Sequence, residues 1–289
     1  MIERVFVTGG AGNVGRKVVQ ELVDNYIQAT VYTKDVAKAY DLFPYDCSLT
    51  FVEGDYNDMD AFAKAIVGHT RLFLLVVDVR RLADIKVQYA KIAYQAGVKQ
   101  IVDISSNMVS KAWRYNFASA AQGPAERALV NLPDRAAYVT LRPSSFMTNH
   151  LYFDAVTLRQ GSLVGIVAPN CKQEWISTND IGLAAANILQ EPIEKHANAV
   201  YDMIGDSVSS NERADIFSKV LEREIKYYQV RPLERYKLLN EHVKIPHSIA
   251  YAYCSRDTQR DVNIEIEILL GREPETLKQW ITNNRHYFQ

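Results

Sequence analysis

Cysteine is scarce in this sequence, whose 289 residues include only Cys47, Cys171 and Cys254, far apart from one another. No CxxC pair occurs and no two histidines have HxxxH spacing, so neither a disulfide framework nor a metal site is expected. Scattered, unpaired cysteines are typical of a reducing compartment, which favours a cytoplasmic location. An apolar, strand-like segment begins at Val5, so we expect no secretory signal before it.

Charge of one sign is not in excess, because 33 Lys and Arg residues face 34 Asp and Glu residues. A dedicated nucleic-acid binder carries a basic surplus, so direct contact with nucleic acid is not expected. Long hydrophobic runs are also lacking. The longest, Leu72–Val77, is far shorter than the roughly 20 residues of a membrane span. With 48% hydrophobic residues and almost no net charge, the chain is predicted to be a soluble folded protein.

The first part of the chain alternates short β-branched segments with segments of helical period. This alternation is typical of an α/β protein with a parallel, doubly wound sheet of the Rossmann type. Its right-handed crossovers open the carboxyl ends of all strands on one edge, where ligands bind. The predicted strands are Val5–Thr8, Ala29–Tyr32, Leu49–Val52, Leu72–Val77 and Lys99–Ile104, and the predicted helices are Asn13–Asn25, Val36–Leu42, Asp58–Ile66 and Leu82–Ala96.

Beyond Ile104 the alternation is looser. Pro124 is predicted to occupy the first turn of a helix that ends at Val130, and Asp180 to cap a helix over Ile181–Leu189. Further strands are predicted at Tyr138–Leu141 and Val200–Met203, and further helices from Ser209 or Ser210 to Leu221, over Ile264–Leu270 and over Pro274–Ile281. We predict an NAD(P)-binding domain over residues 1–150, joined by elements from about 175–205, and a smaller, mainly helical substrate lobe over 151–289.

A glycine-rich loop stands where the first strand turns into the first helix. A glycine at such a turn reaches backbone angles that other residues avoid, and Gly12 lets a pyrophosphate approach the backbone. Gly15 lets the helix press against the strand, and the N–H groups at the helix start hold the phosphates. The strand–loop–helix context is the one that a dinucleotide fingerprint requires. The loop residues assigned to the dinucleotide are Thr8, Gly9, Gly10, Ala11, Gly12, Asn13, Val14 and Gly15.

The choice of dinucleotide depends on the end of the second strand. Sites that prefer NAD carry an acidic residue about 20 residues after the glycine loop, bound to the ribose 2′-hydroxyl. Here Lys34 stands at that place and could meet a 2′-phosphate, whereas the adjacent Asp35 could serve the ribose. We therefore expect NADP, with NAD as the alternative. After the third strand, Asp55 could accept a hydrogen bond from the adenine or simply cap its loop.

With these features assembled, the chain resembles the NmrA-like branch of the atypical short-chain dehydrogenase/reductase superfamily. The resemblance extends over nearly the whole chain. It rests on residues 8–15, Val52–Asp55, Ala96–Lys99 before Ile104–Ser106, Leu141–Pro143 with Phe146–Met147 and Asn149, Asp180–Ile181, and Gly271–Pro274. The family includes NAD(P)H-dependent quinone, imine and ene reductases, and also proteins that bind the dinucleotide without turning it over and act as regulators.

The resemblance also implies roles for single residues. It places the pyrophosphate on Gly9–Gly15, the 2′-phosphate region on Lys34 and the adenine on Asp55 with Tyr56. It implies that Val76, Val77, Asp78 and Ser105 flank the ribose and nicotinamide, that Pro143 and Phe146 border the nicotinamide, and that Met147, Asn149 and His150 face the substrate cleft.

The Tyr-x-x-x-Lys pair that short-chain dehydrogenases use as general acid has no counterpart here, because no lysine has a tyrosine four positions before it. The family register puts Ala118 and Gln122 at the two places. Tyr115 and His150 are the alternative proton donors that we consider. Trp113, Tyr115, Phe146, Tyr152 and Phe153 could form an aromatic wall, or belong to the core.

Two functions follow from these observations. The first is an NAD(P)H-dependent oxidoreductase that passes hydride to a small acceptor needing little acid help, such as a quinone, an aromatic compound, an imine or an activated alkene. The alternative is a non-catalytic NADP-binding redox sensor that acts through a protein partner. Isomerase or lyase chemistry on the same scaffold is a further alternative.

Overall fold

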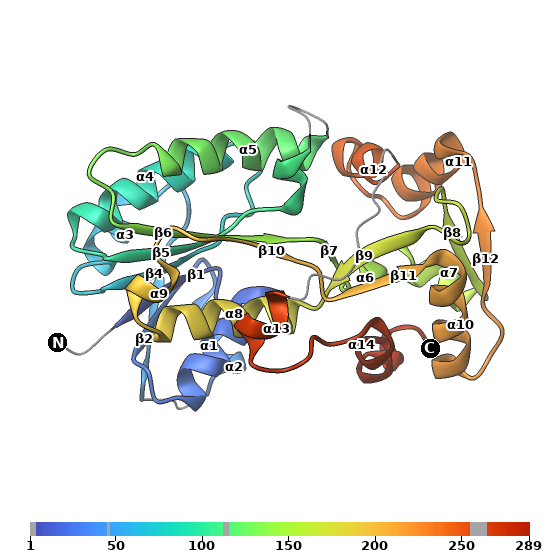
Figure 1. The fold of residues 1–289 in the computed structure, drawn as a ribbon, viewed down its shortest axis with the longest axis horizontal. Coiled ribbons are helices and arrows are strands. Elements are labelled where there is room, and N and C mark those ends of the chain that lie inside the picture. The colour runs from blue at the N-terminus through green and yellow to red at the C-terminus, as the bar shows by residue number, and fades with distance from the viewer. Residues whose placement is uncertain (1–3, 45–46, 112–115, 255–264) are drawn as a thin grey trace.

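The computed structural model describes residues 4–44, 47–111, 116–254 and 265–289 (Figure 1). In these ranges the main sheet has seven strands, ordered β10-β6-β5-β4-β1-β2-β3, and every neighbouring pair is parallel. The predicted doubly wound, Rossmann-type sheet is therefore confirmed. The strands are β1 (Val5–Thr8), β2 (Ala29–Thr33), β3 (Leu49–Glu53), β4 (Arg71–Leu74), β5 (Gln100–Ile104), β6 (Ala137–Pro143) and β10 (Val200–Met203).

Helices cover both faces of this sheet, as Figure 1 shows. One face carries α1 (Asn13–Asp24), α2 (Val36–Leu42), α8 (Thr178–Gln190) and α13 (Glu265–Leu270), and the other α3 (Met59–Ala65), α4 (Leu82–Gln95) and α5 (Phe117–Val130). Each face has its own apolar core. Val18 and Ile181 belong to one cluster, and Phe62 and Tyr89 to the other. Because the sheet is covered on both faces, central strands such as β1 and β5 are buried at every position.

A smaller lobe continues the chain beyond the main sheet. Its sheets are β11 (Asp206–Ser209), β9 (Lys172–Ile176) and β7 (Ser145–Phe146), and β12 (Lys226–Gln229) with β8 (Ser162–Gly165). Its helices are α6 (Asn149–Phe153), α7 (Ala155–Arg159), α10 (Ser210–Leu221), α11 (Pro232–Lys237), α12 (His247–Tyr253) and α14 (Leu277–Asn283), with the short helical segments η2 (Leu238–His242) and η3 (Arg285–Tyr287). Two further short segments belong to the main domain: η1 (Asn107–Ser110) contacts α5, and α9 (Ile193–His196) contacts α8. The domain boundary at residue 150 stays a prediction.

Several predicted boundaries were wrong. Strand β4 ends at Leu74, not at Val77, because the Leu75 N–H turns to the Thr8 hydroxyl and Val77 is 72% exposed. Helix α5 begins at Phe117, since Asn116 and Ser119 form a capping box. Pro124 therefore lies in the helix interior, where it removes one backbone hydrogen bond.

Two later helix starts differ for the same reason, a stronger cap nearby. Ser177 caps α8 by accepting the Asn179 N–H at 3.1 Å, which leaves the Asp180 carboxylate to the C-terminal segment. Thr276 caps α14, so this helix begins three residues after Pro274, at Leu277. Side-chain caps thus decided where these helices begin.

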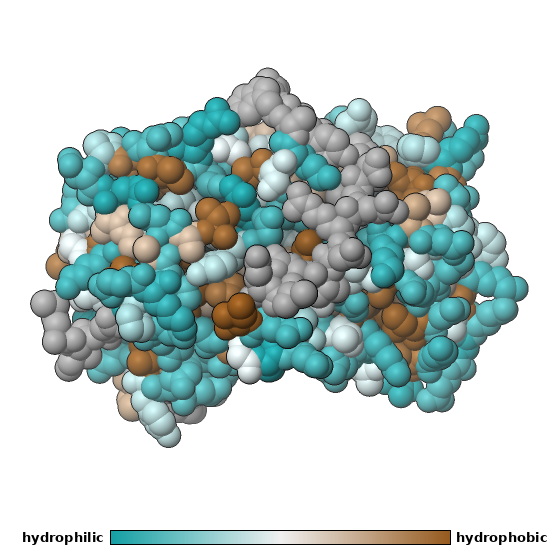
Figure 2. All heavy atoms as spheres, in the orientation of Figure 1, coloured by the Kyte–Doolittle hydropathy of each residue, from teal (hydrophilic) through white to brown (hydrophobic). Residues whose placement is uncertain are grey.

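The surface view in Figure 2 shows mostly hydrophilic side chains, with hydrophobic ones in small scattered groups. This distribution is typical of a folded chain whose apolar side chains lie in the core. Among the described helices, none is both long and apolar enough to cross a membrane.

Candidate dinucleotide-binding site

The glycine loop joins β1 to α1 in a tight turn. Gly9 adopts a φ of +70°, and its carbonyl accepts the Gly12 N–H at 3.0 Å. A Cβ on Gly15 would lie 2.2 Å from the Gly9 oxygen, so only glycine allows this contact between helix and loop. In the described residues no side chain caps α1 at Gly12. The N–H groups of its first turn are therefore available to an anion.

Thr8 joins the two strands, β1 and β4, between which the strand order reverses. Its hydroxyl accepts the Leu75 N–H at 2.8 Å and lies 3.1 Å from the Phe73 carbonyl oxygen. These bonds tie the carboxyl end of β1 to the carboxyl end of β4. In open α/β sheets, this switch point is where ligands bind.

A cavity of about 420 Å³ occupies the crevice. It is lined by the glycine loop and by the segments that follow β2, β3 and β4. Eight predicted site residues meet there: Thr8, Gly9, Ala11, Gly12, Lys34, Asp55, Tyr56 and Val77. The other predicted cofactor residues do not line it: Gly10, Asn13, Val14, Gly15, Val76, Asp78, Ser105, Pro143 and Phe146.

The end of β2 offers two cations to this cavity. Lys34 and Lys38 are both exposed and line it. Asp35 is the N-cap of α2, and its carboxylate accepts the Lys38 N–H at 2.9 Å. The Asp35 carboxylate is thus already engaged in capping α2, which competes with binding of a ribose hydroxyl. Lys38 was not among the predicted site residues, although a second lysine four positions after Lys34 was a usable signal.

The segment after β3 is held by buried tyrosines. The Tyr32 and Tyr89 hydroxyls donate to the Asp55 carbonyl at 3.3 and 3.1 Å. A Cβ on Gly54 would lie 2.2 Å from the Tyr32 hydroxyl oxygen, so this glycine makes room for the ring. The Asp55 carboxylate accepts the Asn57 N–H at 2.7 Å, yet it remains exposed. Asp55 therefore caps its own loop and still presents oxygen to the cavity.

The loops after β3 and β4 are tied together at the cavity rim. The Tyr56 hydroxyl accepts the Val77 N–H at 3.2 Å, and burial raises the pKa of Tyr56. Arg81 donates to Asp78 at 3.0 Å and to Asn57 at 2.8 Å. The hydrogen bond from Arg81 lowers the pKa of Asp78, which is ionised at neutral pH. Asp78 thus closes the rim rather than facing the cavity.

Ser105, at the end of β5, belongs to a separate buried polar cluster. Its hydroxyl donates to Glu126 at 2.8 Å, and Arg142 binds the same carboxylate through Nε at 3.2 Å and also through Nη2. A hollow of about 300 Å³ lies beside Glu126 and Arg142. The Ser105 hydroxyl is therefore directed at α5 by a charged partner.

A second buried cluster, here named the lysine cluster, lies between the main sheet and helices α4 and α5 and consists of Lys86, Asp103, Tyr138 and Gln122. Lys86 of α4 is fully buried and lies 2.7 Å from the Asp103 carboxylate, 2.8 Å from the Ile104 carbonyl and 3.0 Å from the Gln122 amide oxygen. The Tyr138 hydroxyl donates to Asp103 at 2.8 Å. Burial raises the pKa of Asp103, although the adjacent Lys86 lowers it. None of the predicted site residues belongs to this cluster.

Of the two candidate proton donors, only His150 belongs to the described residues, and it does not line the cavity. Tyr115 and Trp113 lie outside the described residues. His150 is fully buried in the smaller lobe, binds Asp154 at 2.7 Å and stacks on Trp175 with ring centroids 4.3 Å apart. Of the proposed aromatic wall, Tyr152 is 55% exposed and Phe153 packs on Tyr253 instead.

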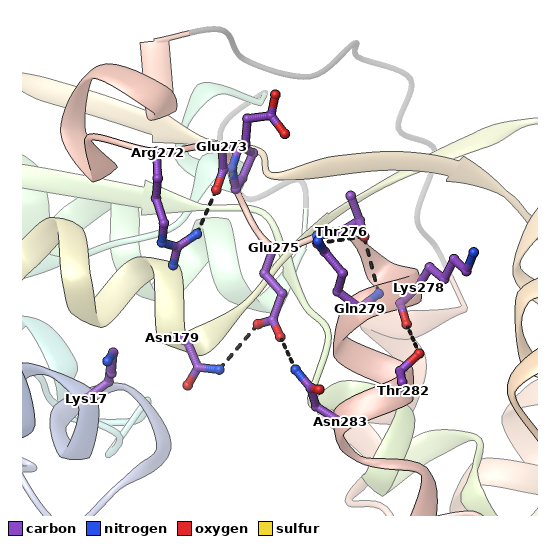
Figure 3. A pocket seen from close by; sticks show the side chains of 11 residues that line it. Lys17, Asn179, Arg272, Glu273, Glu275, Thr276, Lys278, Gln279, Thr282 and Asn283 are labelled. Atoms are coloured by element: carbon purple, nitrogen blue, oxygen red, sulfur yellow. Dashed lines mark hydrogen bonds between the residues drawn. The ribbon is translucent and has the colours of Figure 1, made fainter.

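A larger hollow, about 880 Å³, lies between Lys17, the start of α8 and the C-terminal segment (Figure 3). Its polar groups bind one another. Glu275 accepts from Asn179 at 3.3 Å and from Asn283 at 3.2 Å, while Arg272 pairs with Asp180 at 2.6 Å. None of its lining residues lines the glycine-loop cavity. These contacts fasten the C-terminal segment to α8.

The parallel sheet, its switch point and the glycine loop define the fold of NAD(P)-binding reductases of the Rossmann type. Solved structures agree. An NADPH-dependent quinone oxidoreductase from Escherichia coli, complexed with NADPH, has a TM-score of 0.83 at 21% identity, over 97% of this chain and 99% of the other. NmrA, a negative transcriptional regulator in complex with NADP, has a TM-score of 0.75 at 15% identity, over 98% and 95%.

The particular family follows from the sequence comparison. The NmrA-like family model matches residues 1–287, so the chain belongs to the NmrA-like family. A curated relative from Streptomyces griseus, (4-alkanoyl-5-oxo-2,5-dihydrofuran-3-yl)methyl phosphate reductase, is 24% identical over 292 residues, which cover 98% of this chain and 99% of the relative. The resemblance inferred from the motifs is thus confirmed.

Proposed function

We propose that the protein is an NAD(P)H-dependent oxidoreductase that transfers hydride to a small acceptor of the quinone, aromatic, imine or activated-alkene class. The observation that carries this proposal is the cavity at the switch point, where the glycine loop presents uncapped helix N–H groups. Such groups bind a pyrophosphate. The reductase names among the similar proteins support the same function.

We further propose NADP as the preferred cofactor. Lys34 and Lys38 line the end of the cavity where an adenosine 2′-phosphate lies in this fold, while the Asp35 carboxylate is engaged in capping α2. Asp55 and Tyr56 would contact the adenine. NADPH binding is expected to weaken about tenfold in Lys34→Ala, because one charged phosphate contact is lost, and NADH binding to stay unchanged.

Calorimetric titration of both cofactors tests the preference. Lys34→Ala and Lys38→Ala are compared with Lys91→Ala, which removes an exposed lysine of α4 that does not line the cavity. A ratio of NADPH to NADH dissociation constants that is the same in all four proteins contradicts the assignment of the lysines.

Hydride transfer itself needs a separate test. In the proposed arrangement the segments that carry Val76, Val77, Asp78 and Ser105 flank the ribose and nicotinamide, and Pro143 and Phe146 border the nicotinamide. The bound cofactor supplies the hydride, and the protein orients it and excludes water. Stopped-flow mixing of NADPH-loaded protein with a panel of quinones and imines is expected to consume the nicotinamide absorbance. Tight NADPH binding without consumption by any acceptor would contradict the reductase proposal.

The alternative function is a redox sensor that binds the dinucleotide and acts through a protein partner. It is supported by the similarity to NmrA, a regulator solved with NADP. A sensor requires different affinities for NADP⁺ and NADPH, because a ligand shifts a partner equilibrium only through differential affinity. Equal dissociation constants for the two forms, measured on the same protein, would remove this alternative.

A further inference from the structure

The smaller lobe encloses a second pocket that the proposed function does not use. We name it the arginine pocket and define it by Asp154, Trp175, Arg213, Tyr227 and Arg235, which line it together with residues 164–167. Its volume is about 30 Å³. A water needs about 10–15 Å³ on this measure, so the pocket accepts two or three waters or a group of similar size.

Positive charge exceeds negative charge in this pocket. Arg235 donates to the Asp154 carboxylate at 2.6 Å, and His150 binds the other carboxylate oxygen at 2.7 Å. Although burial alone would raise it, the hydrogen bond from His150 and the charge of Arg235 lower the pKa of Asp154 to about 2. Arg213 has no carboxylate within ion-pair distance in the described part of the chain. The pocket therefore holds two guanidinium groups and one carboxylate.

Unsatisfied hydrogen-bond donors surround the same space. Arg213 is 5% exposed, Arg235 2% and Trp175 2%. In each of them a buried nitrogen, respectively Nε, Nη1 and Nε1, has no partner among the described residues. These groups can only donate, so what satisfies them must be an acceptor. A buried charge without a partner is costly, which makes an anionic acceptor the best complement.

The donors are also held in place. The Arg213 guanidinium lies 5.0 Å from the centroid of the Trp175 ring, and Trp175 stacks on His150. Such a rigid arrangement lowers the entropy that binding costs. We propose that the arginine pocket binds a compact oxyanion, a carboxylate or a phosphate-type group, through Arg213, Arg235 and Trp175.

The position of the pocket suggests whose oxyanion this is. Ser145 of β7 lines it and pairs with Trp175 of β9. Phe146, the next residue of β7, is proposed to border the nicotinamide. If the proposed reductase function holds, on which this step alone rests, the oxyanion is a substituent of the hydride acceptor. The smaller lobe then selects acidic acceptors over neutral ones.

Anion binding is tested first on the whole protein, without any turnover. Acetate, benzoate and inorganic phosphate are titrated by calorimetry at constant ionic strength, with acetamide and benzamide as neutral controls. The titrations are repeated with saturating NADP⁺, which occupies the glycine loop. We expect saturable binding of at least one anion that persists with NADP⁺. Comparing the carboxylate titrations with the phosphate titration shows which oxyanion the pocket prefers. Binding that NADP⁺ abolishes, or none, overturns the proposal.

The Trp175 indole N–H gives a readout at the pocket itself. The chain has three tryptophans, so Trp175→Phe identifies its indole signal in a ¹⁵N-correlated NMR spectrum. We expect this signal of the parent protein to move downfield on anion addition, because the N–H gains an acceptor. An anion that binds without moving it binds elsewhere, which contradicts the assignment. This readout does not depend on whether an arginine variant folds.

Arg213→Met distinguishes a ligand-binding arginine from a structural one. Methionine keeps much of the volume and removes a buried charge that lacks a carboxylate, so the melting temperature is expected to stay equal or rise. Anion binding is expected to fall at least tenfold. Arg231→Met, which removes an exposed arginine before α11, is the matched control and is expected to bind the anion as the parent does. Unchanged anion binding in Arg213→Met, with the Trp175 signal still responding, overturns the role of Arg213.

Kinetics then separate this inference from the proposed function. With a carboxylated quinone and its uncharged parent as acceptors, Arg213→Met is expected to raise KM about tenfold for the acid only. Equal effects on both acceptors contradict the substrate assignment. If neither acceptor is reduced by the parent protein, the reductase function fails, whereas the anion titrations still decide whether the arginine pocket binds an oxyanion.

Discussion

The lysine cluster between the main sheet and α4 and α5, and the arginine pocket of the smaller lobe, are both buried and ionic, yet their charges differ in balance. Lys86 has one carboxylate, one carbonyl and one amide oxygen as acceptors, and Asp103 has the Tyr138 hydroxyl as well. Arg213 lacks a carboxylate partner in the described residues. A balanced buried pair can be purely structural, whereas an unbalanced one points to a missing ligand.

Removing Lys86 from the lysine cluster should cause the largest loss of folding stability. Lys86→Met leaves Asp103 buried without its cation and is expected to lower the free energy of unfolding by about 3–5 kcal/mol. Urea denaturation measures the loss. Adding Asp103→Asn removes the stranded charge and should restore part of the stability. If Lys86→Met were as stable as the parent, as expected for Arg213→Met, the contrast between the two clusters would disappear.

The glycine loop extends the comparison to a site built from backbone. In Gly15→Ala the new methyl group would collide with the Gly9 carbonyl, 2.2 Å away. We expect dinucleotide affinity to fall about 100-fold, or about 2.7 kcal/mol, with anion binding in the arginine pocket unchanged. Calorimetry measures both. Gly123→Ala is the control, because a Cβ there meets nothing within 4 Å. Parent-like NADPH affinity in Gly15→Ala would contradict the loop assignment.

The sheet and the glycine loop could be predicted because their signals are local. β-branched runs and glycine spacing are properties of short segments, and the strand order follows from right-handed crossovers. The Lys86 burial also had a signal, since Lys86 stands between Leu82, Ile85 and Tyr89 in a helical apolar stripe. A lysine within such a stripe indicates a buried cation that needs a carboxylate partner.

The arginine pocket had no such signal. Asp154 lies between α6 and α7, whereas Arg213 belongs to α10 and Arg235 to α11, and each alone is an ordinary charged residue in or beside a helix. Only the packing of α10 and α11 against β8 and β9 brings them together. The helix starts at Phe117 and Leu277 were missed for a different reason, because caps at Asn116 and Thr276 outweighed the prolines on which the predictions relied.

A change of pH should act on the two clusters in opposite directions. The folded-state pKa of Asp154 is about 2, below its ordinary value of 3.8, so the unfolded chain binds more protons there. Its contribution, on the order of 2 kcal/mol, is present above about pH 4 and lost as pH falls toward 2. Asp103 has a raised pKa, so its contribution is lost as pH rises through that pKa.

Denaturation of the parent and of Asp154→Asn between pH 7 and pH 3 separates the two effects. Asp154→Asn is expected to start less stable and to lose less stability in acid, because the titrating carboxylate is gone. Parallel pH curves for the two proteins would show that Asp154 has the same pKa in the folded and the unfolded chain, which contradicts its stabilisation by Arg235 and His150.

The smallest loss of folding stability is expected for an ion pair of which only one partner is buried. Asp180 is fully buried at the start of α8, but the Arg272 side chain that binds it is 44% exposed. Asp180 also accepts the Glu275 N–H at 2.7 Å, so it keeps a partner when the arginine is removed. Arg272→Ala should therefore cost only about 1 kcal/mol, measured by urea denaturation beside Arg231→Ala as an exposed control. A loss as large as that of Lys86→Met would mean that solvent does not reach this pair, and that the C-terminal segment closes over α8 as tightly as a core element.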